Sequence, residues 1–100
     1  MELLSIQDTQ KAFQNGTIRC TDQVQSCLQR IEATSQYNLY IEIASDAALK
    51  RAAELDERRR NGQSCGRLAG VVFSIKDVLC WQGHATTASS KILQGFKAPY

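Results

Sequence analysis

The sequence lacks several features that would place it in a known broad class. It has one proline, Pro99, so no proline-rich linker divides its 100 residues. No apolar run approaches the roughly 20 residues of a membrane-spanning helix, and the opening residues are acidic where a secretory signal is basic. We therefore expect a soluble, cytoplasmic protein of one small domain, with no membrane partner.

Metal-binding and histidine-based sites have few candidate residues. The four cysteines form no Cys-x-x-Cys pair, which argues against a zinc or redox site and favours reduced thiols. His84 is the only histidine, so a Cys-His or Ser-His-Asp mechanism would have to use it. It lies in a turn-rich stretch without an adjacent acidic residue, which favours an exposed loop. The net charge of +2 is too small to indicate electrostatic attraction to nucleic acid.

Apolar spacing and capping residues predict two helices in the first third of the chain. The first is expected over residues 6–15, because Ser5 begins a capping arrangement and Gly16 follows as a stop. The second is expected to begin at Cys20 or Thr21 and to end within residues 33–38. Its apolar stripe has the i, i+3, i+4, i+7 spacing of one helix face. The stripe consists of Val24, Cys27, Leu28 and Ile31.

A third helix is expected over residues 46–60. Ser45 is a suitable N-cap, and Asn61 with Gly62 forms a suitable stop. A small apolar stripe faces the core, and charge pairs at i, i+4 spacing are expected on the solvent side. The stripe is Ala48, Ala52 and Leu55, and the pairs are Asp46 with Lys50, Glu54 with Arg58, and Asp56 with Arg60.

Two segments have the composition of β-strands. Residues 39–43 are β-branched and aromatic, and residues 70–75 form a continuous apolar run typical of a strand covered on both faces. A strand covered on both faces needs neighbours, and two strands alone are marginal in water. We therefore expect an unfinished sheet with exposed apolar surface around residues 71–75.

Lys76 is the main candidate for chemistry, because it directly follows the apolar run. The carboxyl ends of strands are where open α/β sheets place ligands, and desolvation there lowers the pKa of a lysine toward a neutral, proton-accepting amine. The alternative is a strand end that reaches solvent, with the ammonium in water and Asp77 capping the next residues of the chain. Spacing alone favours this alternative.

Two other clusters have simpler structural explanations. Ser89 and Ser90 offer hydroxyl groups, but their position before residues 91–93 is typical of the N-cap of a short helix. The arginine run of residues 58–60 is expected to be a solvated helix end.

The second half of the chain also carries a pattern that resembles the beginning of the amidase signature family. The pattern consists of residues 70–77, Gly83, Thr86 and Thr87, residues 90–93, Phe96, and Pro99 with Tyr100. Within that family it is most similar to the A subunits of tRNA-dependent amidotransferases. The resemblance implies an α/β fold, the N-terminal part of a mixed sheet flanked by helices. It implies about three helices plus two or three strands, with residues 1–100 as a segment truncated before the serine-containing motif.

The resemblance implies a catalytic set of a nucleophilic serine, a second serine in a cis peptide bond, and a lysine. The lysine of its Lys-Asp pair maps onto Lys76, whereas both serines would lie downstream of this chain. Val72 and Ala85 stand where family members usually carry proline, which removes rigidity but no reacting group. Trp81 also departs from the family pattern, and nothing in the sequence explains it.

The resemblance further implies an activity and partners. Glutamine would be hydrolysed to ammonia, which subunits B and C would use with misacylated tRNA to form Gln-tRNA(Gln) or Asn-tRNA(Asn). ATP and Mg would be bound by a partner subunit, with no cofactor in this chain. The isolated chain is expected to be inactive. A stand-alone amidase acting on small amides, and a non-catalytic binding module, are the alternatives.

Overall fold

The computed structural model describes residues 4–100. These residues form two compact units, and each is described by itself. The helical unit comprises the described residues up to Leu39 together with Ala44–Val72. The loop unit comprises Tyr40–Ile43 together with Phe73–Tyr100.

Helix α1, Ile6–Gln14, begins as its sequence predicts. The Ser5 hydroxyl oxygen accepts the Asp8 backbone N–H at 3.1 Å, and the same hydroxyl donates to the Asp8 carboxylate at 2.7 Å. The helix ends one residue before the predicted boundary, at a turn that contains Gly16 with a φ of 76°. The capping arrangement inferred from the sequence is thus confirmed.

Helix α2, Cys20–Ala33, is followed by the short 3₁₀ helix η1, Ser35–Tyr37. Helix α2 begins at Cys20, one of the two predicted starts, and its end lies within the predicted range. Val24 is buried, and Leu28 packs against the buried cluster. Cys27 and Ile31 are half-buried, so the predicted stripe is only partly buried.

Helix α3, Ser45–Arg60, corrects two details of the sequence interpretation. Ser45 is the first helical residue rather than the cap, and Ala44 occupies the N-cap position without a side-chain hydrogen bond. The spacing predicts that Asp56 pairs with Arg60 on the solvent side, but the Asp56 side chain is buried. The i, i+4 rule locates neighbours within one helix and takes no account of a second helix that packs on the same face.

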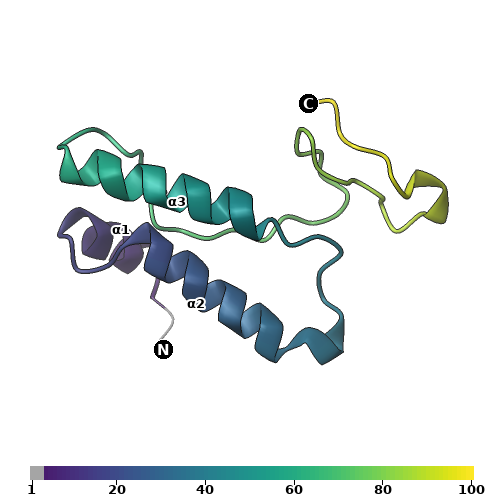
Figure 1. Cartoon of the computed structure of the whole chain (residues 1–100), viewed down its shortest axis with the longest axis horizontal. Coiled ribbons are helices and arrows are strands. Elements are labelled where there is room, and N and C mark those ends of the chain that lie inside the picture. Colours follow the sequence, from purple (N-terminus) through teal and green to yellow (C-terminus); the bar gives the residue numbers. More distant parts are fainter. Residues whose placement is uncertain (1–3) are drawn as a thin grey trace. The chain divides into compact units, whose positions relative to one another are not determined.

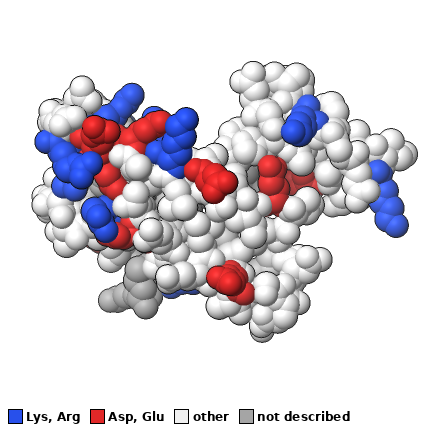
Figure 2. Space-filling view, viewed as in Figure 1, with Lys and Arg blue, Asp and Glu red and all other residues white. Residues whose placement is uncertain are grey.

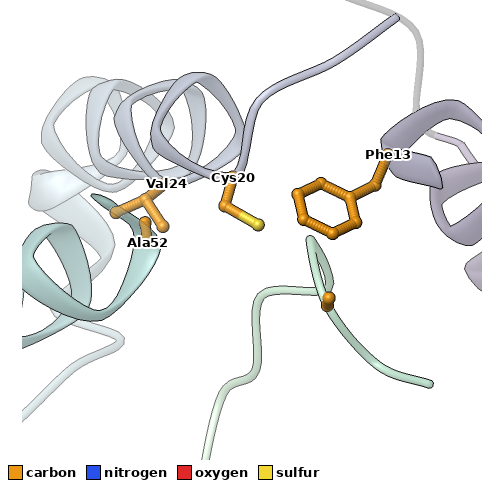
Figure 3. Packing of buried hydrophobic residues seen from close by; sticks show 5 residues of the cluster. Phe13, Cys20, Val24 and Ala52 are labelled. Carbon is orange, nitrogen blue, oxygen red and sulfur yellow. The ribbon is translucent and has the colours of Figure 1, made fainter. Parts of the chain in front are cut away.

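The core of the helical unit lies between the helices. Figure 1 shows α2 and α3 side by side, and Figure 3 shows Val24 of α2 facing Ala52 of α3. In the same view the Cys20 thiol points toward the ring of Phe13 from α1. Ala69 completes the buried cluster. Because its members are few and mostly small, this core buries little apolar area.

The predicted strands at residues 39–43 and 70–75 are absent from the described residues, and this part of the fold prediction is wrong. The β-type pairing within residues 4–100 is one isolated antiparallel bridge between Ala85 and Lys97. A strand is stabilised by backbone hydrogen bonds to a neighbouring strand. Side-chain composition alone does not supply that neighbour. The helical content agrees with the expected fold, whereas the sheet does not form.

Gly70 shows why the apolar run does not begin as a strand. It is buried, its φ is 88°, and it belongs to a turn in which the Val71 N–H donates to the Leu68 carbonyl at 3.0 Å. A Cβ built on Gly70 would lie 3.4 Å from the Thr9 side chain and 3.5 Å from that of Phe13. The backbone at Gly70 therefore packs against α1, in a conformation that favours glycine.

The loop unit is held by turns and by the bridge. The Ala98 N–H donates to the His84 carbonyl at 3.0 Å, and the Thr86 N–H donates to the Phe96 carbonyl at 3.3 Å. The short helix predicted after Ser90 is present as the 3₁₀ helix η2, Lys91–Leu93. Ser90 holds the N-cap position, but its hydroxyl makes no capping hydrogen bond. Among the helices of residues 4–100, none combines the length and apolarity that a membrane crossing needs.

Candidate functional site

Lys76 lies in the loop unit, directly after a stretch of exposed residues. Its side chain is exposed, as are those of Phe73 and Ile75 before it. Its carbonyl accepts the Leu79 N–H at 3.0 Å, so the chain turns immediately after it. Within residues 4–100 the lysine therefore has the solvated environment of the alternative interpretation.

Asp77, the next residue, contacts a segment ten positions further along the chain. Its Oδ1 accepts the Thr87 backbone N–H at 2.9 Å, and its Oδ2 accepts the Thr87 hydroxyl. Its backbone carbonyl accepts the Ala88 N–H at 3.0 Å. The Thr87 hydroxyl, with the N–H groups of Thr87 and Ser89, lowers the pKa of the Asp77 carboxyl below its ordinary value.

The segment that Asp77 holds is a tight turn. Thr87 is buried, and the Ser90 N–H donates to its carbonyl at 2.8 Å. Ala88 and Ser89 have φ values of 47° and 63°, the left-handed region that residues other than glycine enter at an energetic cost. Ser89 therefore contributes to a constrained backbone turn.

His84 is half-buried in a small polar cluster, which corrects the expectation of an exposed loop histidine. Its Nδ1 lies 3.1 Å from Glu42 Oε1, and its ring stacks on Trp81 with centroids 3.5 Å apart. Glu42 Oε2 accepts the Ala85 N–H at 3.2 Å. Hydrogen bonding to His84 and Ala85 lowers the pKa of Glu42. Sequence reasoning missed Glu42 because it precedes the histidine by 42 positions.

The arginine run at the end of α3 has a structural role at its middle member. The Arg59 guanidinium lies over the Phe13 ring, 5.4 Å from its centroid. Arg58 and Arg60 are exposed. Figure 2 shows basic and acidic side chains interspersed on the visible face of the molecule. The expectation of a solvated helix end is therefore confirmed for Arg58 and Arg60 and is wrong for Arg59, which is half-buried.

The cysteines are unpaired, and their environments differ. Cys20 is buried and Cys80 is exposed. Burial, together with the nearby Asp56 carboxylate, raises the pKa of Cys20 from 9.0 to about 11. Within the described part of the chain, no group of three His, Cys, Asp or Glu side chains is arranged to hold a metal ion.

A family model described as Amidase matches residues 22–100, which include Lys76, Asp77 and Thr87. The chain belongs to the amidase family. This amidase segment includes the whole of the loop unit and helices α3 and η1, together with most of α2.

The chain as a whole is also similar to individual curated proteins. It is 42% identical to the glutamyl-tRNA(Gln) amidotransferase A subunit of Chloroflexus aurantiacus, covering 97% of this chain and 20% of the relative. It is 41% identical to the mitochondrial A subunit of Xenopus tropicalis, covering 97% of this chain and 18% of the relative. It is 38% identical to the human mitochondrial A subunit, covering 96% of this chain and 18% of the relative.

The chain thus spans about a fifth of the length of these relatives. No solved structure matches it.

Proposed function

We propose that this chain is the N-terminal part of the glutaminase, or A, subunit of a tRNA-dependent amidotransferase. The observation that carries the proposal is the similarity to proteins of that name, which extends over 97% of the chain. The family model adds the amidase class of chemistry to this assignment. Residues 1–100 would form the beginning of an amidase domain that continues beyond Tyr100.

Lys76 is the proposed base. An amide is hydrolysed through a serine hydroxyl only when a base takes the hydroxyl proton, and a neutral lysine amine serves this purpose in Ser-Lys enzymes. An ammonium group carries no free electron pair, so the amine must be shielded from water to be neutral. Lys76 is exposed in this chain. The shielding, the relaying serine and the nucleophilic serine would come from the rest of the domain.

The partners of the assembled enzyme follow from the same assignment. Glutamine is the proposed substrate, and subunits B and C, with the misacylated tRNA, would receive the ammonia. ATP and Mg would be bound by a partner subunit. The proposed location is the cytoplasm, which fractionation of cells expressing the parent protein would test.

A chimera tests the proposal. Residues 1–100 replace the matching 98-residue region of the Chloroflexus aurantiacus relative, and ammonia release from glutamine is measured with and without subunits B and C. We expect ammonia release, and amidation of Glu-tRNA(Gln) once the partner subunits are present. The unaltered relative is the positive control.

Two outcomes would contradict the assignment. A folded chimera that hydrolyses small aliphatic amides but not glutamine would identify the segment as part of a stand-alone amidase. Ammonia release by the isolated 100-residue chain that is lost in Lys76→Ala would show that the chain holds its own nucleophile. We expect no activity from the isolated chain.

A further inference from the structure

We propose that Asp77 and Thr87 are positioning residues that fix the place of Lys76. The inference rests on the proposed function for its catalytic meaning, and on the geometry of the loop unit for the positioning itself. Asp77 would act through the main chain beside Lys76, and Thr87 would act through Asp77.

The first step is that the Asp77 carboxylate is already engaged. One oxygen accepts the Thr87 N–H at 2.9 Å and the other accepts the Thr87 hydroxyl. Both bonds have an ionised acceptor, which makes them stronger than bonds between neutral groups. The Asp77 carboxylate is therefore directed at Thr87. Because Asp77 directly follows Lys76, these two bonds restrain the backbone next to the lysine.

The second step is that backbone bonds extend this constraint to Lys76. The Asp77 carbonyl accepts the Ala88 N–H at 3.0 Å, and the Lys76 carbonyl accepts the Leu79 N–H at 3.0 Å. The side chain and the main chain of Asp77 thus both bind the same turn. With two points of attachment, Asp77 cannot rotate about either one alone. The Cα of Lys76, one peptide unit away, is held with it.

The third step is that the turn is a stiff anchor. Thr87 is only 8% exposed, and the two residues after it have the left-handed backbone conformation. Residues in such conformations persist where the surrounding structure holds them. Asp77 and Thr87 supply that hold at the start of the turn, so removing the Thr87 hydroxyl should loosen the turn and Lys76 together.

The fourth step concerns the reaction. A lysine base must reach its proton donor at hydrogen-bond distance, and a misplacement of about 1 Å costs up to about a hundredfold in rate. Lysine has a flexible four-carbon side chain, so the position of its Cα limits the region that the amine can reach. A fixed Cα at Lys76 therefore favours the productive position.

Two buried threonine residues give a matched set of variants. Thr87→Val removes the hydroxyl that binds Asp77, and Thr87→Ser restores it. Thr9→Val is the control, because Thr9 is equally buried at 6% exposed and lies in helix α1 of the helical unit, outside the hydrogen bonds around Lys76. All three are made in the 100-residue chain and in the chimera.

In the 100-residue chain, ¹⁵N relaxation measures the order of the Lys76 amide. We expect Thr87→Val to lower its order parameter, while Thr87→Ser and Thr9→Val leave it at the parent value. Equal order in the parent and Thr87→Val, or an equal loss in Thr9→Val, would overturn the positioning role. This measurement needs no activity, so it decides the proposal even if the chimera is inactive and the proposed function fails.

In the chimera, the rate of glutamine hydrolysis is expressed per folded molecule. We expect Thr87→Val to lower kcat at least about tenfold with KM nearly unchanged, and Thr87→Ser to restore it. A purely structural role would lower the folded fraction without changing this normalised rate. An active chimera in which Thr87→Val retains the parent kcat would refute the positioning of a catalytic lysine.

Discussion

Asp56 joins two helices through hydrogen bonds. It lies in α3, is 5% exposed, and its carboxylate accepts the Cys20 N–H at 2.6 Å and the Thr21 N–H at 3.1 Å. The Thr21 hydroxyl donates to the same carboxylate at 2.9 Å. The first N–H groups of a helix have no partner within it, and Arg19 at the N-cap position of α2 makes no side-chain bond to them. An aspartate from another helix therefore caps α2.

Asp56→Ala should lower the free energy of unfolding by about 2 kcal/mol, because it removes a cap and leaves buried donors unpaired. Urea denaturation of the 100-residue chain measures the change. Glu57→Ala is the control, since Glu57 is exposed on the same helix and should shift stability by no more than about 0.5 kcal/mol. Equal effects of the two substitutions would contradict the capping role.

Cys20 should make the helical unit less stable at alkaline pH. Its pKa is raised to about 11, mainly by burial, so the folded state keeps a proton that the unfolded thiol loses near pH 9. Its stabilising contribution is complete below about pH 9 and is lost as the pH rises toward 11.

Under reducing conditions, Cys20→Ala should lose less unfolding free energy between pH 8 and pH 10 than the parent chain. Cys80→Ala, at an exposed site, should behave like the parent. A parallel pH dependence in all three proteins would refute this assignment.

The helices could be predicted from the sequence, and the strands could not. The Ser5 cap and the end of α3 are set by neighbouring residues, so local patterns located them. The apolar composition of residues 70–75 indicated a strand, yet strand formation depends on a partner whose residues are distant or absent. For the same reason, the Asp77–Thr87 and Glu42–His84 contacts could not be seen in local spacing.

Gly70 is a local determinant of the helical unit. Gly70→Ala should destabilise the chain by about 1 kcal/mol, because an alanine there would be forced into the unfavourable φ of 88°. Gly62→Ala is the matched control, since Gly62 also has a positive φ but nothing lies within 4 Å of the added Cβ. Thermal unfolding of both variants measures the difference. A similar loss is expected in both variants, because the added Cβ at Gly70 meets Thr9 and Phe13 at ordinary van der Waals distances. Unchanged stability in Gly70→Ala would contradict the role of its positive φ.

At the scale of the whole molecule, the chain exposes apolar surface that its own described residues do not cover. The expected exposure near residues 71–75 is confirmed, with Phe73 62% and Ile75 48% exposed. Soluble proteins rarely leave contiguous apolar patches in water without an interaction to cover them. The chain spans about a fifth of its relatives, and the rest of an amidase domain is the proposed cover. The assignment of Lys76 came from family resemblance, because its solvated surroundings in this chain give no local sign of a base.

The most direct test of the account is the rate of ammonia release from glutamine by the chimera and its Lys76→Ala variant. Removal of a general base lowers kcat by about a hundredfold to ten-thousandfold, and we expect a loss in this range. Lys91→Ala, an exposed lysine of the same unit, should keep the parent rate. An active chimera that loses nothing in Lys76→Ala would contradict the central claim that this lysine is the base.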